Sequence, residues 1–172
     1  MKLAGLDYFD LSSHLSDNEC RVQKSAREFV DNEILPIIDA HFEGGTFPDN
    51  LIPKFAEMGF FGINLPKEDG CCGMNNIIYG LVCQELERGD SGVRSFISVQ
   101  NSLVMYPIHT YGSDSQKKKW LPLLASGESI GCFGLTEPDH GSDPGSMQTR
   151  AKKAEGGYLL NGAKMWITNG TC

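Results

Sequence analysis

The sequence predicts an α+β protein in which an N-terminal α-helical bundle is followed by the first strands of an antiparallel sheet. Apolar residues recur at helical spacing as far as about residue 125, whereas from Ile130 onward they alternate with polar residues. The pairs Gly156-Gly157 and Asn161-Gly162 mark turns between the short alternating runs. We therefore expect a helical domain over residues 1–128 and the incomplete start of a sheet domain over residues 129–172.

The first two helices are predicted from their end signals. Ser16 and Glu19 fit a capping box, and apolar residues at helical spacing follow. We expect a helix from about Asp17 to the neighbourhood of Pro36, where it either ends or continues with a kink. A second helix is expected over residues 51–60, where a pair of nearby glycines ends the apolar pattern.

Two longer helical patterns and one short one follow. We expect a helix over residues 75–88, a break at a Gly-Asp-Ser-Gly run, and a further helix over residues 93–111. The second of these is apolar on nearly all sides, which is typical of a helix at the centre of a bundle. Ser113 or Asp114 then caps a short helix whose three consecutive lysines, at 117–119, are expected to form a solvated face.

The C-terminal part of the chain is expected to hold short strands. The pattern predicts strands over residues 131–135, 149–154, 157–160 and 164–168. Because so few strands neither close a barrel nor cover both faces of a sheet, we expect the chain to be a piece of a larger protein.

Composition and charge exclude several classes of protein. The chain has 15 Lys plus Arg against 22 Asp plus Glu, and the net charge of -7 argues against nucleic acid or an anionic membrane as a partner. No apolar run reaches the roughly 20 residues of a membrane span. Neither a signal-peptide core nor an Arg-rich transit pattern is present, so we expect a bacterial-type cytoplasmic protein, or a mitochondrial matrix protein whose transit peptide has been removed.

The six cysteines show no pair of Cys-x-x-Cys elements. We read them as reduced thiols and expect no metal site, because structural zinc sites usually space their ligands by two to four residues.

The turn after Leu135 is a candidate binding feature. Its Pro, Asp, Gly and Ser residues present backbone N–H groups, around Gly141 and Ser142, that suit a pyrophosphate or a polarised ring edge. A tight corner at a domain boundary explains the same residues equally well.

A second candidate is the run Trp166-Ile167-Thr168. Strand alternation places Trp166 and Thr168 on one face, where an aromatic surface beside a hydroxyl donor suits a planar heteroaromatic ring. A tryptophan in a strand is also commonly a core residue, so the run alone leaves both interpretations open.

The third candidate is Arg94, with Ser95 beside it, at the head of an apolar helix. A buried guanidinium needs a carboxylate partner, and Asp90 and Glu87 are both near in sequence. An internal ion pair is the simpler explanation. The alternative is that Glu87 orients Arg94 to receive the carboxylate of a ligand in bidentate fashion.

Taken together, these residues resemble the acyl-CoA dehydrogenase family. The resemblance rests on the order of a helical bundle, the motif Leu-Thr-Glu-Pro-x-x-Gly-Ser-Asp at 135–143 and the motif Lys-x-Trp-Ile-Thr-Asn at 164–169, and it covers nearly the whole chain. It implies a helical N-terminal domain, a β-barrel middle domain and FAD bound against the barrel. The cofactor-binding residues that it implies are Phe133, Leu135, Thr136, Gly141, Ser142, Trp166, Ile167 and Thr168.

Within the family, residues 85–95 and 131–134 look most like glutaryl-CoA dehydrogenase, although that subfamily commonly has Tyr where this chain has Val93. The resemblance implies that Arg94 and Ser95 bind the free carboxylate of the acyl chain, since a monocarboxylic chain would not offset burial of a cation. It makes Glu87 the orienting partner of Arg94 and places Ser142 near acyl-CoA as well.

The implied reaction is FAD-dependent α,β-dehydrogenation of glutaryl-CoA, with decarboxylation to crotonyl-CoA and transfer of electrons to an electron-transfer flavoprotein. A full-length homotetramer is also implied. The family's catalytic base is a Glu that would lie beyond Cys172, so we expect no catalytic residue here and no turnover by residues 1–172 alone. Glu137 is expected to fix its turn and not to act as the base.

Two alternatives remain open on sequence grounds. One is a family member with another acyl substrate, either a dehydrogenase for monocarboxylic chains or an oxidase. The other is a non-catalytic module that acts only in binding or assembly.

Overall fold

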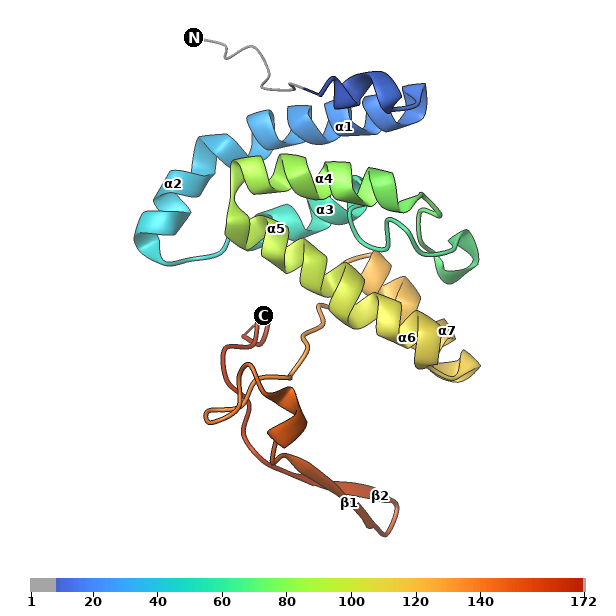
Figure 1. The fold of residues 1–172 in the computed structure, drawn as a ribbon, viewed down its shortest axis with the longest axis vertical. Helices are drawn as coiled ribbons and strands as arrows, with labels where there is room; N and C mark the ends of the chain where they lie inside the picture. Colours follow the sequence, from blue (N-terminus) through green and yellow to red (C-terminus); the bar gives the residue numbers. More distant parts are fainter. Residues whose placement is uncertain (1–8, 172) are drawn as a thin grey trace.

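A computed structural model describes residues 9–171 of the chain. The helices up to α7 form one body, and the C-terminal segment lies beside it and carries a two-stranded hairpin at its far end (Figure 1). In chain order the helical elements are η1 (Leu11–His14), α1 (Asp17–Phe29), η2 (Val30–Ile34), α2 (Leu35–Gly44), η3 (Asp49–Leu51), α3 (Ile52–Glu57), η4 (Lys67–Asp69), α4 (Asn76–Gly89), α5 (Ser91–Ser98), η5 (Val99–Met105), α6 (Tyr106–Tyr111), α7 (Asp114–Ala125) and η6 (Pro144–Ser146).

The first helical run begins at the expected capping box and continues beyond Pro36 to Gly44. The hydroxyl of Ser16 accepts a hydrogen bond from the backbone N–H of Glu19, whose carboxylate in turn accepts one from the N–H of Ser16 at 2.8 Å. The run passes through η2, a π-helical segment, into α2. Pro36 comes directly after the π-helical segment η2, where the N–H of Leu35 bonds to the carbonyl oxygen of Val30, five residues back, and this wider turn accommodates the proline without ending the run.

The central helical run extends from Ser91 to Tyr111. It consists of α5, the π-helical segment η5 and α6, joined without a break, as its all-round apolar pattern predicts. The cap of α4 is Asn75 and the cap of α5 is Asp90, whose carboxylate accepts from the N–H of Val93 at 2.7 Å. α4 packs between α1 and α5 (Figure 1).

The hydrophobic core lies where these helices meet the segment after α3. Phe55 packs against Phe61 and Phe96, with ring centroids 6.3 and 6.2 Å apart. One polar side chain, Asn101 of η5, is buried among them. Its amide makes hydrogen bonds of 2.6 to 3.1 Å with backbone groups of Phe60, Gly62, Ile63 and Ile97. The segment after α3 is therefore fastened to the central helical run by an amide that has all its hydrogen-bonding groups satisfied.

The two strands are β1 (Arg150–Ala154) and β2 (Gly157–Asn161). They pair antiparallel, with Arg150 opposite Asn161 and Ala154 opposite Gly157. Gly156 takes a φ of 77° in the two-residue turn, a conformation that glycine adopts without steric cost. Both strands lie where the alternating pattern predicts them.

Two expected strands were wrong. Residues 131–135 are not in a ladder: among the described residues no strand pairs with them, the N–H of Gly131 donates to the side chain of Gln100, and the carbonyl oxygen of Leu135 accepts from Lys164. Residues 164–168 are not a strand either, because Trp166 has a φ of 58° and Thr168 begins a turn.

Residues 9–171 contain no helix that is both long and apolar enough to span a membrane.

Candidate functional site

A hollow of about 220 Å³ lies at the junction of the helical body and the C-terminal segments. Three separate pieces of chain form its wall: the start of η5, the segment before the turn at 137–140, and the segment that follows the hairpin. The lining residues are Val99, Leu103, Phe133, Leu135, Thr136, Trp166, Ile167 and Thr168. Six of them are residues that the sequence singled out, although the strands that were to align them are absent.

The wall of the hollow combines exposed apolar surface with free hydroxyl groups. Trp166 is 83% exposed and Phe133 42% exposed, so neither aromatic ring is in the core. Among the described residues, the hydroxyls of Thr136 and Thr168 make no hydrogen bond, while the carbonyl oxygen of Thr136 accepts from the N–H of Met165 at 2.9 Å. A flat ligand with polar atoms at its edge suits such a wall, because it covers the rings and pairs with the hydroxyls.

Trp166 is held in a strained backbone conformation. Its φ of 58° lies in the left-handed region, which a bulky residue other than glycine rarely adopts. The indole is solvent-exposed within this chain, so its own packing does not compensate for the strain. Strain of this kind concentrates at binding sites, where the conformation serves the ligand.

Glu137 fixes the turn that follows the hollow. Its carboxylate accepts hydrogen bonds from the N–H of Gln148 at 2.6 Å and the N–H of Thr149 at 2.8 Å, and from the ammonium group of Lys164 at 3.0 Å. Hydrogen bonds from Thr149 and Gln148 hold the pKa of Glu137 well below its usual range. A carboxylate so stabilised in its ionised form is a poor base, as expected for a residue that shapes its turn.

Gly141 and Ser142 lie outside the hollow. They occupy the exposed turn after His140, and neither lines the cavity. Their predicted contact with a phosphate or with acyl-CoA stays a prediction.

Arg94 lies on α5 and is paired with Glu87 at the end of α4. Its Nε donates to Glu87 Oε2 at 2.5 Å, and its Nη1 donates to the hydroxyl of Ser98 at 3.3 Å. The hydrogen bond with Glu87 raises the pKa of Arg94. The hydrogen bond from Ser91 and then that from Arg94 lower the pKa of Glu87. Asp90, the other candidate partner, caps α5 instead.

The pairing leaves part of the guanidinium open. Among the described residues, Nη2 of Arg94 makes no hydrogen bond, and the side chain is 36% exposed. The hydroxyl of Ser95 is also free of intramolecular hydrogen bonds within the described chain. Neither Arg94 nor Ser95 lines the hollow. Ser95 lies one turn before Val99, which does, so both predicted carboxylate-binding residues stand on the helical run that forms one wall.

Sequence reasoning missed Ser98, Val99 and Leu103. The spacing of Arg94 and Ser98, four residues apart on one helix, was a usable signal for their contact. No sequence signal marked Val99 and Leu103 as lining residues, because an apolar residue on an apolar helix cannot be told from a core residue in the sequence.

A hydroxyl pair, Tyr79 with Ser102 at 2.7 Å, also lies between α4 and η5, and burial raises the pKa of Tyr79 to about 12.

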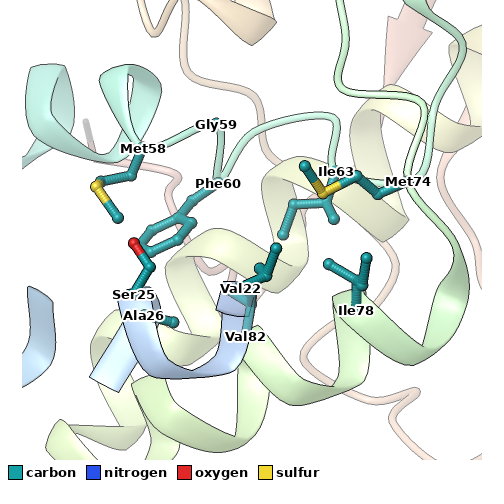
Figure 2. Close-up of a pocket in the computed structure, with 10 residues that line it drawn as sticks. All are labelled: Val22, Ser25, Ala26, Met58, Gly59, Phe60, Ile63, Met74, Ile78 and Val82. Atoms are coloured by element: carbon teal, nitrogen blue, oxygen red, sulfur yellow. The ribbon is translucent and has the colours of Figure 1, made fainter. Parts of the chain in front are cut away.

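A smaller cavity of about 110 Å³ lies within the helical body (Figure 2). It is bounded by α1, α4 and the segment after α3, and its lining includes Val22, Phe60 and Ile78. Ser25 supplies its one polar side chain, so it offers no acid, base or cation for chemistry. Among residues 9–171 no group of three or more His, Cys, Asp or Glu side chains is placed to hold a metal ion.

Comparison with known proteins gives family matches over almost the whole chain. Residues 16–128 match the acyl-CoA dehydrogenase N-terminal domain, and residues 132–172 match the acyl-CoA dehydrogenase middle domain. A solved glutaryl-CoA dehydrogenase from Mycobacterium smegmatis in complex with FADH2 is 50% identical, with a TM-score of 0.91, and the match covers 94% of this chain and 42% of that chain.

Curated relatives belong to the same family and include one that is named as specific for short chains. An acyl-CoA dehydrogenase of Bacillus subtilis is 40% identical over 91% of this chain, and a mitochondrial short-chain specific acyl-CoA dehydrogenase of Rattus norvegicus is 34% identical over 92%. The chain spans 41% and 38% of the lengths of these two relatives. From the match of its two domains and the likeness of its fold, the chain belongs to the acyl-CoA dehydrogenase family of FAD-dependent oxidoreductases.

Proposed function

We propose that the protein to which this chain belongs oxidises glutaryl-CoA at its α,β-bond with FAD as cofactor, and then releases CO2 to give crotonyl-CoA. The observation that carries the proposal is the environment of Arg94, a cation with an open Nη2 on the helical run that forms one wall of the hollow. The 50% identity to a glutaryl-CoA dehydrogenase supports it, and the 40% identity to an acyl-CoA dehydrogenase supports the coarser reaction.

The wall of the hollow fits the isoalloxazine ring of FAD. Phe133, Leu135 and Trp166 offer apolar surface to the ring faces, and the free hydroxyls of Thr136 and Thr168 are available to its polar edge. When bound, FAD supplies the acceptor for the hydride that leaves the β-carbon. Ile167 adds apolar surface to the same wall, while Gly141 and Ser142 are proposed to meet phosphate groups of the cofactor or of acyl-CoA farther along.

Arg94 and Ser95 are proposed to bind the distal carboxylate of the substrate. The guanidinium offers Nη2 and the remaining proton of Nη1, and Ser95 offers a hydroxyl. Glu87 and Ser98 hold the guanidinium from its other sides, so the cation does not have to be ordered when the substrate arrives. The distance between Arg94 and the reacting carbons would then select the length of the acyl chain.

The remaining steps need groups from outside this chain. The base that removes the α-proton is proposed to be a carboxylate in the rest of the protein, because Glu137 is fully engaged by hydrogen-bond donors. The family resemblance supports electron-transfer flavoprotein as the electron acceptor and a homotetramer as the full-length assembly.

A second candidate is dehydrogenation of a short monocarboxylic acyl-CoA. The ion pair between Glu87 and Arg94 favours it, because Glu87 already neutralises the guanidinium and no substrate carboxylate is needed for that purpose.

A substrate comparison with the full-length protein separates the two. We expect the protein purified with FAD to oxidise glutaryl-CoA with a kcat/KM at least about 10-fold above that for butyryl-CoA, a difference of about 1.4 kcal/mol in transition-state binding. Release of CO2 in proportion to flavin reduction would support the decarboxylation. Equal or better use of butyryl-CoA would favour the second candidate.

A further inference from the structure

Gly131 is held from both sides by side chains that do not themselves line the hollow. Its N–H donates to the side-chain carbonyl of Gln100 at 2.8 Å, and its carbonyl oxygen accepts from the amide of Asn169 at 3.3 Å. A Cβ on Gly131 would lie 2.4 Å from a methyl group of Val104, so the backbone is pressed against η5. The three contacts fix the point where the chain leaves the helical body.

Gln100 is fully buried, and both the NH2 group and the oxygen of its side-chain amide make hydrogen bonds near the point where the chain leaves the helical body. Its Nε2 donates to the carbonyl oxygens of Leu124 and Ser129, both at 3.0 Å, while its Oε1 accepts from Gly131. Two donors facing carbonyls and one acceptor facing an N–H admit a single orientation of the amide. Gln100 therefore joins the end of α7 and the connecting segment to η5.

Asn169 connects the third piece of the wall, the segment after the hairpin, to Gly131 as well. Its Nδ2 donates to the carbonyl oxygens of Gly131 and Phe96, both at 3.3 Å, and its φ of 65° is a left-handed conformation that asparagine tolerates. Asn169 follows Thr168 directly, so the contact ties the Trp166–Thr168 segment to α5 and to Gly131.

The three pieces of the wall therefore share one anchor. Gln100 is next to Val99 of the first piece, Gly131 lies two residues before Phe133 of the second, and Asn169 lies one residue after Thr168 of the third. Among residues 9–171, the second and third pieces are linked directly by one backbone hydrogen bond, from the N–H of Met165 to the carbonyl oxygen of Thr136, and by the hydrogen bonds of Lys164 with Leu135 and Glu137. The amides of Gln100 and Asn169 add the connection of both pieces to the helical body.

We propose that Gln100 and Asn169 are positioning residues that hold the flavin-facing wall in register through Gly131, an inference that rests on the proposed function of the hollow. Neither residue lines the hollow. Each acts by placing Phe133, Thr136 and Thr168 at the spacing that the ring requires, so that loss of an amide weakens cofactor binding more than it weakens the fold.

The test uses the full-length protein and measures the FAD dissociation constant, the visible absorption spectrum of bound flavin and the apoprotein Tm. Asn169→Gly keeps the left-handed backbone and removes the donor, and Asn169→Asp keeps the shape and removes the donor. We expect both to raise the FAD dissociation constant about 5- to 10-fold and to shift the flavin spectrum, with the Tm of Asn169→Gly within about 3 °C of wild type.

Gln100→Met and Asn101→Leu form a matched pair, since each deletes a buried amide from η5. Asn101 bonds only within the helical body, so its variant should lose Tm while keeping FAD affinity within about 2-fold, measured well below its Tm. Gln100→Met should lose both. Should Gln100→Met fail to fold, the two Asn169 variants decide the question alone.

If the wild-type protein binds FAD and the Asn169 variants bind it equally well, the inference is overturned and the proposed function stands. An equal loss of FAD affinity in Asn101→Leu would also overturn it, because the effect would then follow stability alone. A wild-type protein that takes up no FAD would overturn the proposed function and this inference with it.

Discussion

Lys164 and Glu137, 27 residues apart in sequence, form an ion pair of 3.0 Å beneath the candidate site. The same ammonium group donates to the carbonyl oxygen of Leu135 at 2.9 Å. Lys164 thus ties the segment that carries Trp166 to the segment that carries Thr136, while Gly131 and Asn169 join the other ends of the same two segments.

Replacing Glu137 with Gln should lower the Tm and make stability less dependent on pH in acid. The amide of Gln cannot accept all the hydrogen bonds that the carboxylate accepts from Gln148, Thr149 and Lys164. The folded-state pKa of Glu137 is depressed, so its contribution is fully present above its unfolded pKa of about 4.3 and is lost as the pH falls toward the folded value.

Thermal melts from pH 3 to 7 measure this effect. The difference in Tm between wild type and Glu137→Gln should be constant above about pH 5 and should shrink below about pH 4. Glu155→Gln, in the exposed hairpin turn, is the matched control and should show no such difference. A Tm difference that grew on acidification would contradict the assignment.

Replacing Glu85 with Gln should lower the free energy of unfolding by about 2–3 kcal/mol. Glu85 is 1% exposed and accepts hydrogen bonds from Arg27 at 2.7 and 3.0 Å and from Arg88 at 3.1 Å. The two arginines remain partly exposed, so the cost stays below that of a fully buried pair.

Urea unfolding of the full-length protein measures the effect of Glu85→Gln. Lys24→Gln is a suitable control, because the pair of Lys24 with Glu28 is exposed on α1 and its loss should cost less than about 0.5 kcal/mol. Similar losses in the two variants would show that burial of Glu85 is not what makes its ion pairs matter.

Replacing Asn101 with Leu should lower the free energy of unfolding by about 2–4 kcal/mol, since four buried backbone groups lose their partner. Asn64→Ala removes a side-chain bond to Asn76 at the surface and should cost about 0.5 kcal/mol or less. Urea titrations of both variants give the comparison, and a cost near that of Asn64→Ala would mean that water replaces the amide of Asn101.

Replacing Trp166 with Gly should separate stability from cofactor binding. Glycine relieves the left-handed strain at φ 58°, so the apoprotein should gain about 0.5–1 kcal/mol, while loss of the indole should weaken FAD binding. Calorimetry of the apoprotein and FAD titration measure the two effects. Trp166→Phe keeps the strain and an aromatic surface and should change both less; a destabilised Trp166→Gly apoprotein would show that the indole supports the fold.

Features encoded by neighbouring residues were predictable from the sequence. The capping box at Ser16, the cap at Ser113 and the strand pair expected over 149–154 and 157–160 depend on residues a few positions apart. The structure has both caps, and it has the strands at 150–154 and 157–161. The acyl-CoA dehydrogenase resemblance, carried by the spacing of a few motifs, was confirmed.

Features set by distant contacts were not predictable. Trp166 alternates with Thr168 as a strand residue would, yet its φ is 58°, and Lys164 and Asn169 on either side of it contact segments 29 and 73 residues away. Gln100 and Asn101 are ordinary polar residues in a helical pattern, and only the packed structure shows that their amides are buried and fully paired. The π-helical segment η5 likewise has no local signature.

The assignment of Arg94 to the substrate carboxylate is tested most directly by substrate selectivity. We expect Arg94→Gln to lower kcat/KM for glutaryl-CoA about 100-fold or more, because a bidentate charged hydrogen bond of about 3 kcal/mol is lost, while kcat/KM for butyryl-CoA stays within about 3-fold. Arg94→Lys keeps the charge but loses the paired N–H donors of the guanidinium, so its kcat/KM for glutaryl-CoA should lie between those of wild type and Arg94→Gln. Equal losses on both substrates would contradict the account and make Arg94 a structural partner of Glu87.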